Sequence, residues 1–191
     1  METVISEEKI SVSEFRTMLF EDDDNYYYEI IDGHMIRKSA PAPLHQRISR
    51  KLLLALDKHI SETKSGELFQ SPIDVYLDEY NKPQPDIIFI SKEKSAMITH
   101  DGIMGIPDLI IEIISPTSII RDRIEKKNLY ERMAVQENWL VDPQYEAIEI
   151  YTLQNNRYEL FSAATTLEGE FKSAIFDGFS INLTDIFAVT A

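Results

Sequence analysis

The stretch PDLIIEIISP, from Pro107 to Pro116, is the part of the sequence that decides the fold. Its unbroken apolar run is typical of a central β-strand that is covered on both faces. Side chains alternate across a strand, so Glu112 shares one face with Ile110 and Ile114. An unpaired ionised carboxylate is costly in a protein core. Glu112 must therefore be protonated, paired with a cation, or bound to a metal.

A second carboxylate stands in a similar position earlier in the chain. Asp86 opens the apolar run of QPDIIFIS (Gln84 to Ser91) and shares a face with Ile88 and Ile90. If the two strands are neighbours, Asp86 and Glu112 lie about 5 Å apart at Cβ and repel each other. A hard cation such as Mg²⁺ binds carboxylates and water, so the two acids predict a metal site.

The segment after Glu112 offers a third group, which would orient water or stabilise charge on a phosphate. RDRIEKK contains Asp122, Lys126 and Lys127. Asp122 and Lys126 are four residues apart and therefore lie on one face of a helix. The order acid, acid and lysine, on strand, strand and following helix, is more specific than any one of these residues.

The other segments predict an α/β sandwich, in which a mixed sheet has a helix on each side. We expect a short helix from Ser11 to about Leu19 with a capping box, a solvated acidic loop at 21–24, and a hairpin that turns at 32–33. A long helix over 43–62 and two strands with a turn at 79–82 follow. After the Pro107 stretch we expect an amphipathic helix over 118–135, with inner positions at Ile120, Ile124, Leu129 and Met133. Three strands with turns at 142–143 and 155–156, and a last strand with a short closing segment, complete the chain.

The composition of the 191-residue chain excludes several classes of function. The absence of cysteine excludes disulfides, thiolate metal sites and a Cys nucleophile. No Gly-rich strand-to-helix turn or P-loop pattern is present, which argues against a Rossmann fold and a P-loop nucleotide site. The formal net charge of −14 has the wrong sign for general attachment to phosphates. A nucleic-acid role would therefore need a local basic patch or a bridging metal.

The same features predict the organisation and location of the protein. We expect one domain over residues 1–191, with an N-terminal helix within 1–20 and a core over 25–187. The sequence contains no apolar run of membrane-spanning length, and its N-terminus does not resemble a signal peptide. We therefore expect a cytoplasmic protein with no membrane partner.

Six segments together resemble the restriction-endonuclease-like Uma-two family of the PD-(D/E)XK nuclease superfamily. They are, in order, YYYEIIDGHMI, HQRISRKLLLAL, QPDIIFIS, GIPDLIIEIISP, RDRIEKKNLY and ENWLVDP. The resemblance extends from about residue 10 to residue 187. It implies an α/β (α+β) fold, with a restriction-endonuclease-like mixed β-sheet flanked by helices. It also implies hydrolysis of DNA phosphodiester bonds with Mg²⁺ or Mn²⁺ as the cofactor.

The resemblance assigns roles to individual residues. Asp86 matches the aspartate of the PD motif and Glu112 matches the second acid, so both would be catalytic and would bind the metal. The superfamily lysine is expected two residues after the second acid, where this chain has Ile114. The family pattern instead has a lysine in the following helix. Here it matches Lys126, and Lys127 stays open as the alternative.

Other polar residues are candidates for additional roles. Glu29 in the hairpin and His45 near the start of the long helix match polar positions of the family. Glu29 would complete the metal shell, and His45 would contact phosphate or water. Gln84, just before the PD aspartate, would support the site. Asp108 lies about 13 Å along its strand from Glu112, so we expect it to end a turn instead.

The candidate phosphate contacts are basic side chains at two places. They are Arg47, Arg50 and Lys51 on the long helix, and Arg121, Arg123 and Lys127 on the following one. Because duplex cleavage needs two cuts, we expect a homo-oligomer, in the simplest case a dimer, formed through the late strands around Tyr151 and Tyr158. Two alternatives stay open: a nuclease-fold binding module without cleavage activity, and a metal-dependent hydrolase of a small phosphorylated substrate.

Overall fold

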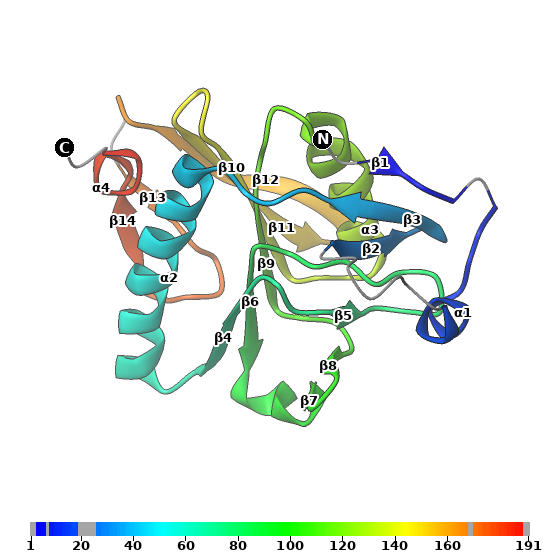
Figure 1. Cartoon of the computed structure of the whole chain (residues 1–191). Helices are drawn as coiled ribbons and strands as arrows, with labels where there is room; N and C mark the ends of the chain where they lie inside the picture. Colours follow the sequence, from blue (N-terminus) through cyan, green and yellow to red (C-terminus); the bar gives the residue numbers. More distant parts are fainter. Residues whose placement is uncertain (1–2, 7, 19–25, 168–169, 189–191) are drawn as a thin grey trace.

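A six-stranded sheet lies at the centre of the computed structural model, which describes residues 3–6, 8–18, 26–167 and 170–188 (Figure 1). Its strand order is β12-β11-β10-β9-β6-β4. The strands are β4 (Gly66–Gln70), β6 (Ile87–Ser91), β9 (Leu109–Ile113), β10 (Glu137–Asp142), β11 (Ala147–Gln154) and β12 (Arg157–Thr165). β9 and β10 run parallel and the other neighbours antiparallel, so the sheet is mixed, as predicted.

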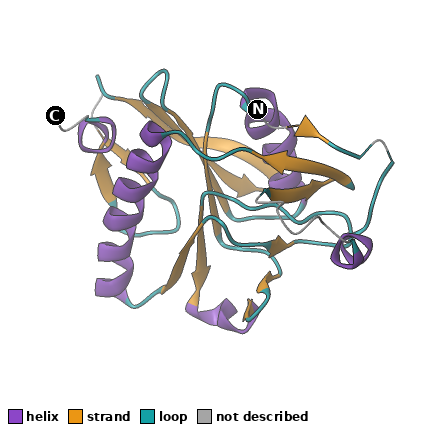
Figure 2. Cartoon of the chain, in the orientation of Figure 1, coloured by secondary structure: helices purple, strands orange, loops and turns teal. Residues whose placement is uncertain are grey.

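Other elements cover both faces of this sheet, as Figure 2 shows by the helices on its two sides. One face packs against α2 (Pro43–Thr63) and against the C-terminal elements β13 (Glu170–Lys172), β14 (Ser180–Asn182) and α4 (Leu183–Phe187). The other face packs against the hairpin of β2 (Tyr27–Ile31) and β3 (His34–Lys38) and against α3 (Lys127–Arg132). The predicted arrangement of a mixed sheet flanked by helices is confirmed.

The central strand β9 is buried along its whole length. Ile111 and Ile113 belong to the core under α2, whereas Ile110 packs with the hairpin and α3. The predicted alternation is therefore confirmed, and Glu112 lies on the side of the hairpin and α3. This places its carboxyl group between the two layers instead of at the surface.

The predicted N-terminal helix and hairpin are confirmed, whereas the short strand at Thr3–Val4 was not predicted. Helix α1 (Val12–Thr17) begins with a reciprocal capping box between Ser11 and Glu14. The β2–β3 hairpin turns at Asp32 and Gly33, whose φ angles of 50° and 81° suit a two-residue turn. Strand β1 (Thr3–Val4) pairs with β3. The acidic run at 21–24 lies outside the described residues.

Helix α2 packs against the sheet through one apolar stripe. Ile48, Leu52, Leu56 and Ile60 recur every four residues and are buried against the sheet. The helix begins at Pro43, and the backbone N–H that proline lacks would have had no helical partner in the first turn. The predicted helix is confirmed, and its first turn meets the end of the sheet where β6 starts.

The prediction for the second helix is wrong in its choice of buried face. The helix contains η2 (Arg121–Lys126), a π-helical segment, and continues into α3. Ile120 is 69% exposed and Ile124 is 54% exposed, although both were expected to face the core. Leu129 is buried, and Met133 packs partly against the same cluster.

The reason for this error is that the buried face of η2 is polar. Asp122 and Lys126 are 5% and 2% exposed, while the apolar side chains of the same segment point outward. Apolar periodicity locates the inner face only when the core is apolar. π-Helical turns are rare and are often found at functional sites.

The strand expected before the turn at 79–82 is divided into β4 and the short strand β5 (Val75–Tyr76). Three short elements between β6 and β9 were not predicted: the 3₁₀ helix η1 (Lys92–Met97), β7 (Ile98–Thr99) and β8 (Gly102–Met104). Strands β5, β8 and β7 form a small sheet. The expected turn at 79–82 corresponds to the bridge between Asp78 and Asn81.

Within the described ranges, no helix is long and apolar enough to cross a membrane.

The predicted pairing edge is only half right. The three late strands and their turns are confirmed, and β12 is an outer strand of the sheet. Tyr158 lies on β12, but Tyr151 lies on β11, which has a neighbour on each side.

Candidate active site at the ends of β6 and β9

Asp86 and Glu112 lie at the same end of two neighbouring strands. Strands β6 and β9 are antiparallel, and Ile87 is paired with Ile111. Continuing this register by one residue puts Asp86 opposite Glu112. The prediction that the two strands are neighbours is confirmed.

Asp86 is held by the first turn of α2 and by the backbone of β9. Its Oδ2 accepts a hydrogen bond from the backbone N–H of Ile113 at 2.7 Å and lies 3.1 Å from Nε2 of His45. Burial acts to raise the pKa of Asp86, but the contact with His45 and the charge of Lys38 outweigh it and lower the pKa. Asp86 is therefore ionised at neutral pH.

Glu112 has the opposite character. Its Oε1 accepts hydrogen bonds from the Tyr130 hydroxyl at 2.6 Å and from Nζ of Lys126 at 3.1 Å. Burial raises the pKa of Glu112 to about 8; Lys126 opposes the rise, and the charge of Asp86 adds to it. At neutral pH the carboxyl group therefore holds a proton unless a cation takes its place.

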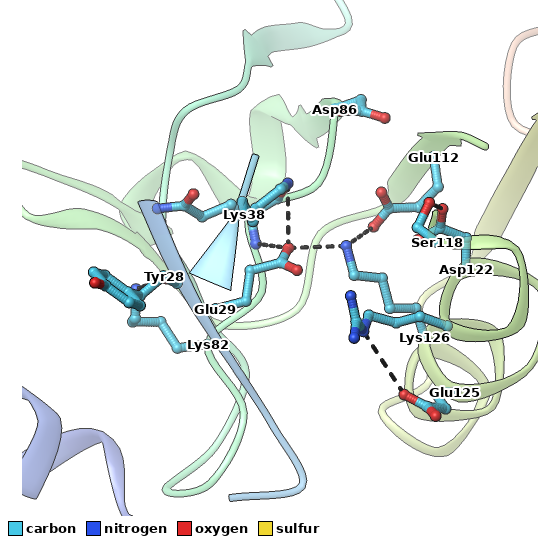
Figure 3. Close-up of polar contacts among 12 residues, drawn as sticks. Tyr28, Glu29, Lys38, Lys82, Asp86, Glu112, Ser118, Asp122, Glu125 and Lys126 are labelled. Atoms are coloured by element: carbon cyan, nitrogen blue, oxygen red, sulfur yellow. Dashed lines mark hydrogen bonds and ion pairs between the residues drawn. The ribbon is translucent and has the colours of Figure 1, made fainter. Parts of the chain in front are cut away.

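Glu29 connects two lysines to this pair. Its Oε1 accepts hydrogen bonds from Nζ of Lys126 at 2.8 Å and from the backbone N–H of Gln84 at 2.7 Å, and Nζ of Lys38 lies 3.5 Å away. Burial alone would raise the pKa of Glu29, but the two ammonium groups bring it down to about 2. Figure 3 shows the resulting chain of contacts, from Lys38 through Glu29 and Lys126 to Glu112.

These side chains form two layers that differ in exposure. The side chains of Glu29, Lys126 and Glu112 are 0%, 3% and 3% exposed, and we call them the floor of the site. The side chains of Lys38, His45 and Asp86 are 15%, 15% and 11% exposed, and we call them its mouth. A ligand that arrives from solvent meets the mouth first.

Several sequence candidates meet in this cluster. The structure brings together Asp86, Glu112, Lys126, Glu29, His45 and the backbone of Gln84, although the side chain of Gln84 turns away to donate to Asp74 at 2.8 Å. Asp122 is buried one turn before Lys126 and accepts a short hydrogen bond from Ser118.

Two candidates lie elsewhere. Of the two lysines left open by the sequence, Lys127 points away, with Nζ 3.8 Å from the centre of the Tyr151 ring. Asp108 is at the opposite end of β9, where its carboxylate accepts the N–H of Ser91 at 2.8 Å and pairs with Lys94 at 2.8 Å. Asp108 lies just before the first residue of β9, as expected for a residue that ends the preceding turn.

The expected phosphate contacts are only partly available. Arg123 is engaged by Glu149 at 2.8 Å and Asp142 at 2.7 Å. The Arg121 side chain is 13% exposed and has Nε 3.9 Å from Glu125, while Lys51 donates to the carbonyl of Ala188 at 2.5 Å. Arg47 and Arg50 are exposed on α2.

Two residues of the cluster were missed from the sequence. Lys38 follows Ile36 by two residues, and Ile36 is paired with Glu29, so the hairpin register puts Lys38 on the same face as Glu29. Tyr130 follows Lys126 by four residues on a helix. The register set by the hairpin turn could have identified Lys38, and the helical spacing could have identified Tyr130.

The donor set suits a hydrated divalent cation. In the part of the chain that the structure describes, no group of three or more Asp, Glu or His side chains is placed to surround an ion. Mg²⁺ is often held by only one or two carboxylates and keeps several waters. The repulsion from Asp86 that helps to raise the pKa of Glu112 is what a cation would offset. Oε2 of Glu29 is also buried without a hydrogen-bond partner among the described residues.

Comparisons with known proteins agree with this fold. The family model Uma2, described as "Putative restriction endonuclease", matches residues 12–184. A crystal structure described as "a putative nuclease belonging to DUF820 from Anabaena variabilis ATCC 29413" is similar, with a TM-score of 0.74 and 19% identity over 93% of this chain and 97% of that one. A search of curated proteins returned no match. Because the Uma2 model matches most of the length of this chain, the chain belongs to the Uma2 family.

Proposed function

We propose that this protein is a Mg²⁺- or Mn²⁺-dependent endonuclease that hydrolyses phosphodiester bonds in DNA. One observation carries the proposal. Asp86 and Glu112 lie at the same end of two neighbouring strands, and Lys126 on the next helix donates a hydrogen bond to Glu112. Acid, acid and lysine are the groups that metal-dependent phosphodiester hydrolysis uses. Membership of the Uma2 family supports the same reaction class.

In this proposal Asp86 and Glu112 hold the metal. When bound, the ion would lower the pKa of a coordinated water and offset charge on the phosphate. The hydrogen bonds from Tyr130 and Lys126 fix Oε1 of Glu112, so its orientation is set before substrate arrives. His45 orients Asp86 in the same way through Nε2.

The acidic character of the chain limits where DNA could bind. Arg47 and Arg50 are exposed on α2, the helix whose first turn also supplies His45, so they would contact the DNA backbone beside the site. The two cuts needed in a duplex favour a dimer. The outer strand β12, on which Leu160 and Phe161 are 57% and 50% exposed, is the candidate contact between the two copies.

Plasmid cleavage in Mn²⁺ tests the proposal. Glu112→Gln and Asp86→Asn should abolish cleavage, because each removes one of the two metal-binding carboxylates. Asp108→Asn is the control, since it makes the same chemical change as Asp86→Asn but lies just before β9, at the end of that strand away from the site. Cleavage by Glu112→Gln at the wild-type rate would refute the assignment.

The same assay separates the proposal from its alternatives. Plasmid, single strands and nucleotides are each offered to the wild-type protein. Hydrolysis of nucleotides alone would favour a small phosphorylated substrate. Binding of DNA without cleavage would favour a binding module, the reading supported by the net charge of −14.

A further inference from the structure

We propose that Lys38, at the mouth of the site, is the lysine that contacts the substrate phosphate, and that Lys126 is a positioning residue. This inference rests on the proposed nuclease function and adds to it a group that the family pattern does not assign. It follows from how the two ammonium groups are engaged and how exposed each one is.

Lys126 is already fully engaged in the floor of the site. Its Nζ contacts Glu29 at 2.8 Å and Glu112 at 3.1 Å, and its side chain is 3% exposed. To reach a phosphate, this ammonium group would have to break both buried contacts and leave the Glu29 carboxylate with only the longer contact to Lys38, which is unfavourable. Its geometry instead suits holding Glu112 and Glu29 in place.

Lys38 is held more loosely and closer to solvent. Its Nζ donates to the backbone carbonyl of Gln84 at 2.8 Å, while the contact with Glu29 is long, at 3.5 Å. Its side chain is 15% exposed, as is that of His45. A third N–H of the ammonium group is therefore left for an incoming anion.

The surroundings keep this lysine charged and fixed. Burial acts to lower the pKa of Lys38, but Glu29 outweighs it and the pKa is raised. Lys38 is the last residue of β3 and is paired with Tyr27, so the hairpin limits its movement. Figure 3 shows its ammonium group on the side of Glu29 where Asp86 lies.

Lys38 therefore gives an acidic protein a cation where the phosphate would enter. Asp86, beside it in the mouth, is a proposed metal ligand, so a phosphate bridging to the ion would pass close to the Lys38 ammonium group. An ammonium group at that point would offset charge on the phosphate.

A matched control stands next to Lys38 on the same strand. Arg37 has the same formal charge, but strand alternation directs it to the other face, where its guanidinium carbon lies 4.2 Å from the centre of the Tyr26 ring. Arg37→Met and Lys38→Met thus change the net charge equally. Only the second removes a cation from the mouth.

The test is the affinity for a labelled DNA duplex, measured by fluorescence anisotropy over a salt series. Ca²⁺ is present as a hard cation that takes oxygen ligands, and a gel confirms that the duplex stays intact. The logarithm of the association constant falls linearly with the logarithm of the salt concentration. Loss of one phosphate contact should make this slope less negative by about 0.9 and weaken binding at low salt about tenfold or more. Lys38→Arg should restore the slope, and Arg37→Met should keep the wild-type slope.

Parallel cleavage assays in Mn²⁺ separate this inference from the proposed function. If Lys38→Met has the same slope as Arg37→Met and cleaves at the wild-type rate, the assignment of Lys38 fails while the nuclease function stands. If the wild type binds DNA with the expected dependence on Lys38 but never cleaves, the nuclease function fails and the phosphate contact stands. A wild type that neither binds nor cleaves DNA refutes both. Melting temperatures check that a change in slope is not a loss of fold.

Discussion

Replacing Lys126 with methionine should destabilise the protein far more than the same change at the adjacent Lys127. Lys126 is the shared partner of two buried carboxylates, Glu29 at 2.8 Å and Glu112 at 3.1 Å. Lys127 packs on the ring of Tyr151, and its charge acts on the more exposed carboxylates of Glu131 and Glu149. The two variants have the same composition and net charge, so they differ only in the contact that is lost.

The structure sets the size of the difference. Removing one partner of a buried ion pair costs about 3–5 kcal/mol. We expect the lower end near neutral pH, because Lys38 stays beside Glu29 and Glu112, with a pKa of about 8, can hold a proton. In a chain of this length each kcal/mol shifts the melting temperature by about 2–4 °C, so a loss of about 6–12 °C is expected. A cation–π contact at the surface contributes about 0.5–1 kcal/mol, or about 1–4 °C.

The pH dependence of this difference has a defined sign. The pKa of Glu29 is lowered from its ordinary value of 4.5 to about 2, against the effect of burial, chiefly by Lys126. A depressed carboxyl pKa contributes stability above the unfolded value, and that stability is lost as the pH falls through the folded one. The gap between Lys126→Met and the wild type should therefore narrow between about pH 4.5 and pH 2. Above about pH 8 it should widen, because the wild-type Glu112 ionises beside Lys126 and the variant has no such partner.

Thermal melting followed by circular dichroism at about pH 3, 7 and 9 measures these differences. The double variant Glu29→Gln with Lys126→Met should recover part of the loss, because it leaves no charge at position 29 without its partner. Equal melting temperatures for Lys126→Met and Lys127→Met at pH 7 would refute the reasoning. A gap that stays constant with pH would show that Glu29 and Glu112 do not depend on Lys126.

Three further predictions concern the metal and the carboxyl groups. Mn²⁺ should raise the melting temperature of the wild type, and Glu112→Gln should abolish this rise while the metal-free protein stays folded; an unchanged rise would remove Glu112 from the metal site. The rise should be larger at about pH 8.5 than at about pH 6.5, since the pKa of Glu112 is raised to about 8 and its proton must leave before the ion binds. Tyr130→Phe removes the 2.6 Å hydrogen bond to Glu112 and should lower the free energy of unfolding by about 1–2 kcal/mol in urea titrations, whereas a neutral effect would mean that the hydroxyl does not hold the carboxyl group.

Much of the fold could be predicted because its signals are local. The turn at Asp32 and Gly33 sets the hairpin register, and the four-residue spacing from Ile48 to Ile60 identifies the inner face of α2. Alternation along β9 correctly places Glu112 on the opposite face from Ile111 and Ile113. Each of these signals depends on residues that are close in sequence, so no knowledge of packing is needed to use them.

The same local signals failed where the core is polar. Ile120 and Ile124 have the spacing of buried residues, yet they face solvent, because Asp122 and Lys126 occupy the inner face. An amphipathic pattern cannot distinguish a buried charged face from a solvated one. The pattern became interpretable only once the partners of those charges were known.

The sequence by itself determined the order of the main helices and strands, the pairing of the hairpin and the presence of an acid inside an apolar strand. Only the tertiary structure decided which charges meet. Lys126 and Glu29 are 97 residues apart in the chain, and their contact depends on the hairpin and α3, the helix that continues η2, packing on the same face of the sheet. Packing also separated Lys126 from Lys127 and brought Lys38 to the mouth of the site. The physical reason is that burial and charge pairing act through space, so they are set by the arrangement of the layers and not by spacing along the chain.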